Sequence, residues 1–265
     1  MSVELRTQAA MERCETEREE TEAKAAAFEA FAERVADAPV ESGGAGSGGA
    51  LSGGTPSGGG PAAGALSVHA TGTSSNGVDV VRSAFRETVL PHADADGVTA
   101  AMADELSTDL AAAFSPAANG LPRESKRTLL ERVDERRSEC RLLVAAVDAE
   151  RERLDEFAAE LDAVTGWLAE ADETSLLRLG FEDLRARHDR LASFRETCDE
   201  LARERQAELR GTRNSGLKGI RKRELVDALY GNFPDDHPVL ADLARLADLL
   251  ADCQRAVRRH LCARA

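Results

Sequence analysis

PRESKRTLLERVDERRSECRLLVAAVDAERERLDEFAAELDAVTGWLAEADE, residues 122–173, is the stretch that decides the fold. It contains no proline after Pro122 and only one glycine, Gly166. Proline suits the first turn of a helix, because the N–H that it lacks would be unpaired there. The stretch therefore predicts one continuous helix, roughly 75 Å long at about 1.5 Å per residue.

The apolar pattern of this stretch predicts a helical partner. Its seam advances in steps of three and four residues, with one interruption of the heptad at Leu154. A second helix is expected over 180–210, with a similar seam, and ADETSLLRLG joins the two. The simplest arrangement is a long antiparallel, coiled-coil-like hairpin over about 122–210. The predicted seams comprise Val133, Arg137, Cys140, Val144, Val147, Arg151, Leu154, Phe157, Leu161, Val164 and Leu168, then Phe181, Leu184, His188, Leu191, Phe194, Cys198 and Leu201.

The composition of the whole chain predicts an elongated all-α protein. Of its 265 residues, 47 are alanine and ten are aromatic, and Ile220 is the only isoleucine. Strands are rich in β-branched and aromatic residues, so this composition favours helices. A charged helix is expected over 3–38, and shorter helices over 79–90 and 98–114, over RKRELVDALY, and from Pro238 onward with Asp235 or Asp236 as the N-cap.

Glycine divides the chain into three predicted segments. Thirteen of the 21 glycines lie between positions 43 and 77. Such a segment buries too little apolar surface to offset the entropy of ordering it. We expect a charged helix at 1–40, a disordered Gly/Ser-rich linker at 41–78, and a helical domain at 79–265 that ends in a helical pair. A phosphate-binding loop is not indicated, because no strand precedes the glycines and no Gly-Lys-Ser/Thr follows.

The charge balance indicates a soluble cytoplasmic protein. The formal net charge is −14, and of 34 basic residues only four are lysine. Adaptation to concentrated salt and a GC-rich genome both produce this pattern, and both point to a haloarchaeal cytoplasm. Neither a signal sequence nor a membrane span is expected, and the charge disfavours non-specific binding to nucleic acid or to an anionic membrane. The five cysteines lie in helical contexts, which favours buried free thiols over disulfides.

One stretch resembles a metal site. In PHADADGVTAAMADEL, residues 91–106, Asp94 and Asp96 lie where a calcium loop has ligands, but His92 and Ala103 replace its first and last carboxylates. We favour a turn in which Asp96 caps the next helix. His92 and His237 stay weak metal candidates, and no zinc-type spacing or catalytic triad is present. We therefore predict no catalytic residue, no cofactor and no enzymatic activity.

A basic segment offers a second possibility. Six Lys and Arg residues lie within 210–223 without an acidic residue between them, among them Arg221, Lys222 and Arg223. With the following helices they could bind nucleic acid. The other interpretation, which we favour, is a basic connector that docks on the acidic surface of the helices.

Two short motifs carry a family resemblance. They are FRETVLPH at 85–92 and KRELVDALYGNFPDDHPVLADLARLADLLADCQRAV at 222–257. With them the chain resembles an uncharacterised helical family, largely confined to haloarchaea, that is described as a domain of unknown function. The resemblance implies helical architecture and haloarchaeal origin, and it transfers no functional residue.

The long seams lead to a functional hypothesis. We expect a structural or interaction protein whose coiled-coil-like surfaces contact a protein partner or a second copy. The alternative is a nucleic-acid-binding regulator that uses 210–223 and the helices after it.

Overall fold

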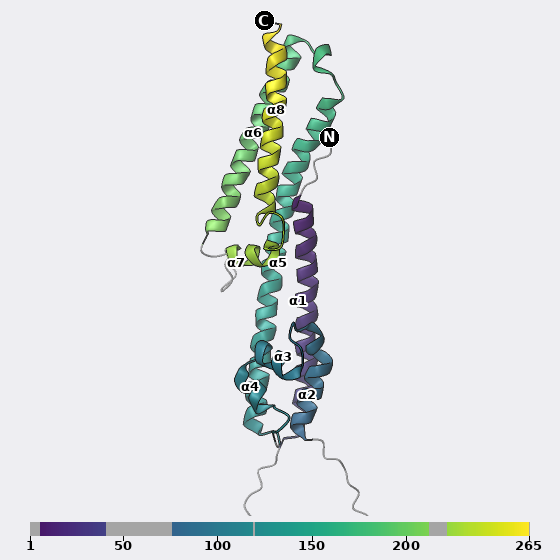
Figure 1. Ribbon diagram of the computed structural model, residues 1–265, viewed down its shortest axis with the longest axis vertical. Helices are drawn as coiled ribbons and strands as arrows, with labels where there is room; N and C mark the ends of the chain where they lie inside the picture. The colour runs from purple at the N-terminus through teal and green to yellow at the C-terminus, as the bar shows by residue number, and fades with distance from the viewer. Residues whose placement is uncertain (1–5, 41–75, 119, 212–221, 265) are drawn as a thin grey trace, which may run out of the picture. The chain divides into compact units, whose positions relative to one another are not determined.

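The computed structural model describes residues 6–40, 76–118, 120–211 and 222–264, and the ordered elements in these ranges are helices (Figure 1). No described residue lies in a strand, which confirms the all-α class. Residues 41–75 of the predicted linker lie outside the described residues. The elements are α1 (Arg6–Asp37), α2 (Gly77–Thr88), η1 (Leu90–His92), α3 (Val98–Glu105), α4 (Thr108–Ala113), α5 (Arg123–Asp172), η2 (Leu176–Arg178), α6 (Phe181–Arg210), α7 (Lys222–Tyr230) and α8 (Pro238–Cys262).

The chain divides into two compact units, and both boundaries fall inside long helices. Unit 1 contains the described residues of Met1–Ala25 and Ser138–Ala265, and unit 2 contains those of Ala26–Arg137. Each unit thus includes part of α1 and part of α5. The predicted segments 1–40, 41–78 and 79–265 follow the order of the chain and stay a prediction.

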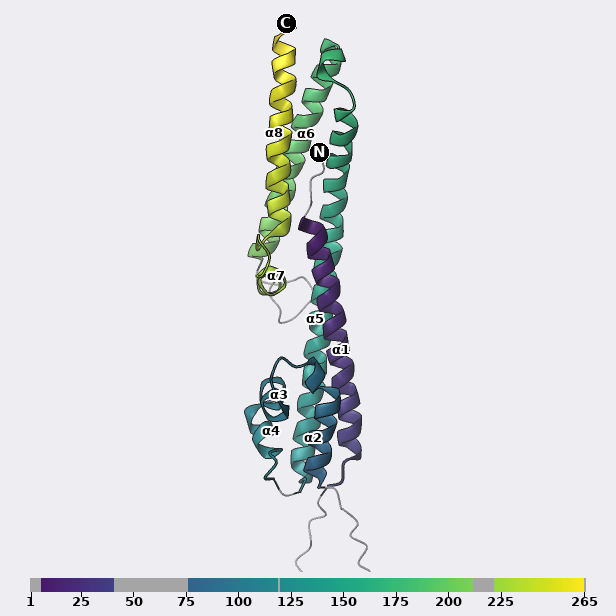
Figure 2. The same cartoon turned by 45° about the vertical axis from the view of Figure 1, so that its right-hand side comes forward.

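Unit 1 is a bundle of long helices. Helices α6 and α8 lie side by side in both views (Figures 1 and 2). Within this unit, Glu150 of α5 meets Arg205 of α6, and the Trp167 ring packs edge-on against Phe194 with centroids 5.3 Å apart. The later α5 residue thus meets the earlier α6 residue, so these two segments are antiparallel. The predicted hairpin also includes the beginning of α5, which belongs to unit 2, and over its full length it stays a prediction.

The beginning of α1 is anchored in unit 1 by a buried carboxylate. The backbone N–H and the hydroxyl of Thr7 both donate to Oδ2 of Asp242 on α8, each at 2.8 Å. The first N–H groups of a helix lack partners within the helix, and Asp242 supplies one from another element. The first turns of α1 therefore pack on their own chain.

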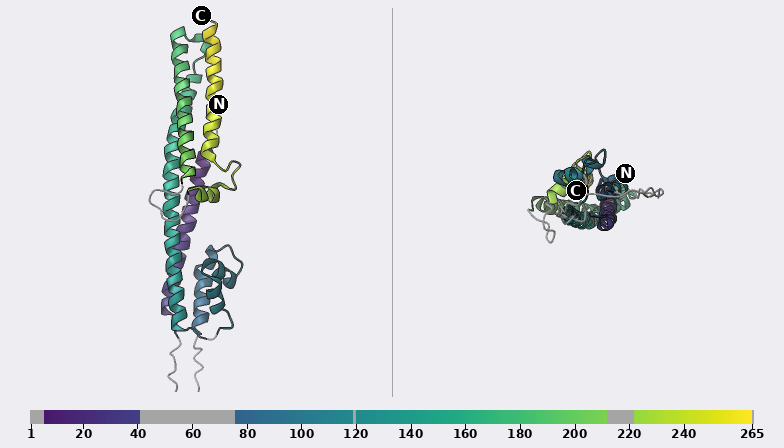
Figure 3. Two further views of the ribbon diagram at one scale, coloured as in Figure 1. Left: turned by 90° about the vertical axis from the view of Figure 1, so that its left-hand side faces the viewer. Right: turned by 90° about the horizontal axis from the view of Figure 1, so that it is seen from below.

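Unit 2 has a second core, formed by the end of α1, by α2, α3 and α4, and by the beginning of α5. Helices α2 to α4 are the group in blue shades in Figure 3. Phe31 and Phe85 meet edge-on at 5.3 Å between centroids. Lys126 donates to the carbonyl oxygens of Ala36 and Ala38, at 2.7 and 2.8 Å, and so satisfies the C-terminus of α1.

Four predicted helix limits are wrong in detail. The helix expected over 98–114 is two helices, because the hydroxyl of Ser107 accepts a hydrogen bond from Leu110 N–H and begins α4. Helix α2 begins at Gly77 instead of 79, because Asn76 caps it by accepting from Val78 N–H. Gly97, with a φ of 99°, and not Asp96, is the N-cap of α3. His237, and not an aspartate, is the N-cap of α8.

The predicted position of the interruption in the α5 seam, at Leu154, is also wrong. Arg151 is exposed, whereas Glu150 is completely buried. With Glu150 included, the series Val147, Glu150, Leu154, Phe157 and Leu161 keeps steps of three and four without a break. From Val147 to Leu161 the seam therefore keeps the heptad pattern with a charged residue in a core position, whereas Val144, Val147 and Glu150 are separated by two successive steps of three.

Two further predictions concern the cysteines and membranes. Cys14, Cys140 and Cys198 are buried free thiols as expected, whereas Cys253 is half-buried and Cys262 is exposed. None of the helices in the described ranges combines the length and the apolar character needed to cross a bilayer.

Candidate functional site

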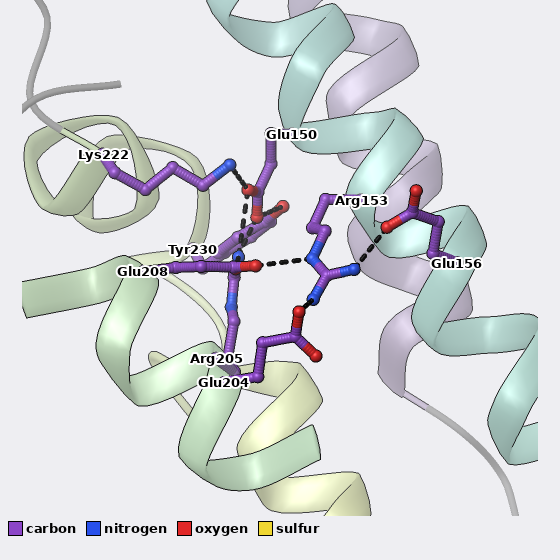
Figure 4. Close-up of polar contacts among 8 residues, drawn as sticks. All are labelled: Glu150, Arg153, Glu156, Glu204, Arg205, Glu208, Lys222 and Tyr230. Carbon is purple, nitrogen blue, oxygen red and sulfur yellow. Dashed lines mark hydrogen bonds and ion pairs between the residues drawn. The ribbon is translucent and has the colours of Figure 1, made fainter. Parts of the chain in front are cut away.

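The most concentrated chemistry in unit 1 is a buried ionic network centred on Glu150 (Figure 4). Glu150 lies on α5 and is fully enclosed. Arg205 of α6 binds both of its carboxylate oxygens, with Nη2 at 2.6 Å from Oε1 and Nη1 at 3.2 Å from Oε2. Lys222, the first residue of α7, pairs with Oε2, and the Tyr230 hydroxyl donates to Oε1 at 3.2 Å. One carboxylate thus joins α5, α6 and α7.

Cys14 adds α1 to this network. Its Sγ lies 3.3 Å from the Tyr230 hydroxyl. The carboxylate of Glu150 can only accept, so Tyr230 gives its single proton to Glu150 and receives one from the thiol. Burial raises the pKa of Cys14 to about 11, which keeps the thiol protonated. Burial also raises the pKa of Tyr230, so its hydroxyl stays a donor.

The ionisation of Glu150 is set by two opposing effects. Burial raises the pKa of its carboxyl, because a charge is poorly solvated in the interior. The hydrogen bond and the charge of Arg205, together with the charge of Lys222, more than offset this, and the pKa lies below the ordinary 4.5. Glu150 is therefore a buried anion held between two cations.

A second group of ion pairs surrounds Arg153, one turn further along α5. Its guanidinium pairs with Glu204 at 2.7 Å, with Glu208 at 2.5 Å and with Glu156. The same guanidinium lies over the ring of Phe157, 4.4 Å from its centroid. Glu208 also accepts from Arg205 at 3.2 Å, which links this group of ion pairs to Glu150.

This arrangement can hold helices together. Its central carboxylate is saturated by one guanidinium, one ammonium and one hydroxyl, all from the same chain. A buried pair of this kind fixes which helix faces meet, because a shift of one element would leave a buried charge unpaired. The side chains of the network line neither of the two cavities described below.

The first of these cavities lies in unit 1, where α5, α8 and the α5–α6 connection meet. Its volume is about 320 Å³. Its lining is mostly apolar, with Trp167, Leu168, Leu176, Leu249 and Val257, and Arg187 and Asp172 are its charged members.

Two large apolar side chains are exposed between Leu176 and Arg187, two residues that line this cavity. Leu177 is 75% exposed and follows the lining residue Leu176, and Phe181 is 46% exposed at the start of α6. Among the described residues, the third exposed large hydrophobic side chain is Leu142, in the middle of α5.

The second cavity lies in unit 2, between α4 and the beginning of α5, and measures about 570 Å³. Its lining is more polar and includes Asp109, Glu124, Glu131 and Arg132.

The two histidine candidates for a metal site lie in different units. His92 ends η1 in unit 2, and His237 precedes α8 in unit 1, and both are exposed. In the described ranges no group of three or more His, Cys, Asp and Glu side chains is arranged to hold a metal ion. Asp94 and Asp96 are exposed in the turn before α3.

The three basic candidates for nucleic-acid binding are in different situations. Arg221 lies outside the described residues. Lys222 is buried against Glu150. Arg223 is exposed, with its Nε 3.8 Å from Asp227. Nucleic-acid binding by this segment stays a prediction.

Sequence reasoning missed Glu150 and Arg205, although their spacing contains a signal. Glu150 follows Val147 by three residues and precedes Leu154 by four, and Arg205 follows Leu201 by four. Both therefore occupy heptad core positions. A charged residue in a core position indicates a buried partner of opposite charge, which here is 55 residues away.

One comparison with known proteins finds a match over almost the whole chain. A family model described as a domain of unknown function (DUF7260) matches residues 6–254. Searches of curated proteins and of solved structures gave no significant match.

Proposed function

Because this chain belongs to the family described as a domain of unknown function (DUF7260), we propose its function from its own geometry. The proposed function is a non-enzymatic helical protein that makes protein–protein contacts through unit 1. The observation that carries this proposal is the exposure of Leu177 and Phe181 on the stretch between Leu176 and Arg187, two residues that line a largely apolar cavity. Exposed apolar side chains next to a pocket are typical of protein interfaces.

The ionic network supports a structural role. Its charged groups pair with one another, so that α6, which begins with Phe181, is held against α5 and α7. A rigid surface loses less entropy on binding than a mobile one. We include in the proposal a cytoplasmic location in a haloarchaeon, supported by the net charge of −14.

A pull-down from lysate at native salt tests the proposal. The tagged full chain is compared with the double variant Leu177→Ser/Phe181→Ser, and with Leu142→Ser as the matched control. We expect protein to be retained by the wild type and by Leu142→Ser, and to be lost from the double variant. Equal retention by all three chains, or no retention above the tag alone, would contradict the proposal.

The alternative function is nucleic-acid binding through the basic segment. Among the residues that the structure describes, the exposed Arg223 is the best candidate for it. The variant Arg221→Gln/Arg223→Gln tests it and leaves the buried Lys222 in place. Nucleic acid enriched by the wild type and lost from this variant would favour the alternative. If the wild type and the variant retain nucleic acid equally and only at background level, the alternative is wrong and the segment 210–223 is a connector.

A further inference from the structure

We propose that the α5–α6 end of unit 1 is a self-complementary interface at which a second copy of this chain docks. Leu177 and Phe181 of each copy would enter the cavity of the other. This inference rests on the proposed function and specifies its partner. Four observations carry it: the size of the cavity, the rigidity of the connection, the local charge and the position of the parts.

The cavity has the size and the character to receive such side chains. Its volume of about 320 Å³ is roughly twice that of an engineered apolar cavity that binds benzene, about 150 Å³. Trp167, Leu176 and Leu249 contribute to its apolar lining. Transfer of the Phe181 ring or the Leu177 side chain from water into this lining is favourable.

The connection that presents these side chains is fixed by hydrogen bonds. Arg264, just after α8, donates to the carbonyl oxygens of Leu176 and Leu177 at 3.3 and 2.9 Å. Arg187 donates to the carbonyl oxygen of Thr174 at 3.3 Å. A connection held in this way loses little further freedom when Leu177 is buried in an interface.

The local charge permits two copies to meet here. Residues 165–190 and 249–264 contain eight arginines and seven acidic residues, whereas the whole chain carries a net charge of −14. Two such chains repel each other over most of their surface. This end of unit 1 is close to neutral, so contact there does not bring the excess negative charge together.

The position of the parts selects a second copy over an unrelated partner. Thr174, Ser175 and Leu176 line the cavity, and Leu177 is the next residue, so one segment carries both the inserting side chain and the receiving surface. In a two-fold symmetric dimer the same patch supplies both halves of the contact. An unrelated partner would need only the cavity or only the exposed side chains.

Sedimentation velocity on the full chain over a range of concentrations tests the inference. We expect the wild type and Leu142→Ser to reach twice the 28.3 kDa of one chain. Leu177→Ser/Phe181→Ser should dimerise at least about tenfold more weakly, as expected for the loss of anchor residues. A second variant, Ala256→Phe, fills the cavity and leaves both inserting side chains in place, and it should weaken the dimer similarly.

Mixing the two variants provides the sharpest test. One supplies an open cavity and the other supplies inserting side chains, so the mixture should form a heterodimer through one of the two contacts. Circular dichroism verifies that both variants are folded. A wild type that is monomeric at all concentrations, a dimer unaffected by the double variant, or a mixture that stays monomeric would overturn the inference.

The result can be separated from that of the proposed function. If the wild type is monomeric but retains a different protein through Leu177 and Phe181, the self-association fails and the proposed function stands. If the wild type is monomeric and retains no protein, both fail.

Discussion

At the scale of single residues, this protein depends on charges that it buries. Glu150 and Asp242 are carboxylates without exposed surface, and each is bonded by residues far away in the sequence. Burial of a charge is costly, and a buried pair often adds little net stability compared with apolar residues of equal volume. What it provides here is a specific match between helices, since other registers would leave Glu150 buried without Arg205 and Lys222.

The substitution Glu150→Gln should destabilise the fold strongly. It removes the anion that pairs with Lys222 and leaves Arg205 with Glu208 alone, and loss of one partner of a buried pair typically costs about 3–5 kcal/mol. Denaturant unfolding measures the free energy of unfolding. Glu152→Gln, at an exposed site on the same helix, should change it by less than about 0.5 kcal/mol. Similar losses in the two variants would contradict the role given to Glu150.

The same carboxylate predicts a loss of stability in acid. The pKa of Glu150 is lowered in the folded state, so the unfolded chain binds a proton first as the pH falls below 4.5. The contribution of Glu150 is complete above that pH and is lost as the pH decreases through the folded pKa. The difference in unfolding free energy between wild type and Glu150→Gln should therefore shrink below pH 4.5. A difference that stays constant would show that Glu150 is not the titrating group.

Cys14 predicts the opposite dependence at high pH. Burial raises its pKa from 9.0 to about 11, so between these values the unfolded chain loses the proton and the folded chain keeps it. The stability contributed by the neutral thiol is complete below pH 9.0 and decreases up to about pH 11. The unfolding free energy of the wild type should decline more steeply over this range than that of Cys14→Ala. If the unfolding free energies of the two proteins change in parallel with pH, Cys14 is not the titrating group.

At the scale of elements, two glycines in helices should respond oppositely to alanine. A Cβ on Gly77 would lie 2.3 Å from the carbonyl oxygen of Pro39 and 2.6 Å from Cβ of Leu121, whereas a Cβ on Gly166 would meet no atom within 4 Å. Gly77→Ala should cost about 1–3 kcal/mol by overpacking. Gly166→Ala should stabilise α5 by about 0.5–1 kcal/mol, because alanine favours the helical backbone.

Thermal unfolding of both glycine variants checks this pair. The melting temperature should fall for Gly77→Ala and rise for Gly166→Ala. A fall in both would show that Gly166 has a role beyond the continuity of α5.

At the scale of the whole molecule, the excess of negative charge should make stability depend on salt. A chain with a net charge of −14 repels itself, and salt screens this repulsion over about 10 Å at 0.1 M and about 3 Å at 1 M. The melting temperature should therefore rise with KCl concentration. A fall towards 1 M would show that the ion pairs contribute more than the repulsion costs.

A variant with four fewer charges provides the control. Glu19, Glu33, Glu152 and Glu160 are exposed, and replacing all four with glutamine reduces the net charge without changing the core. This variant should have a smaller dependence on KCl than the wild type. An equal dependence would assign the salt effect to burial of apolar surface.

The sequence by itself determined the helices of this protein. Scarce β-branched residues, the absence of proline after Pro122, and Pro238 at a first turn are local signals, and α5, α6 and α8 lie close to where they were expected. Backbone propensity and apolar period act over a few residues, so they can be read without knowledge of the rest.

Only the tertiary structure decided which side chains meet. Arg205 lies 55 residues from Glu150 and Tyr230 lies 80 residues from it, and no local pattern selects these partners among the 48 acidic and 34 basic residues. The buried position of Glu150 was missed for the same reason, because it depends on the free energy of its contacts with Arg205 and Lys222. The break at Ser107 is different, because its hydroxyl caps α4 only three residues away and is a local signal that the sequence contains.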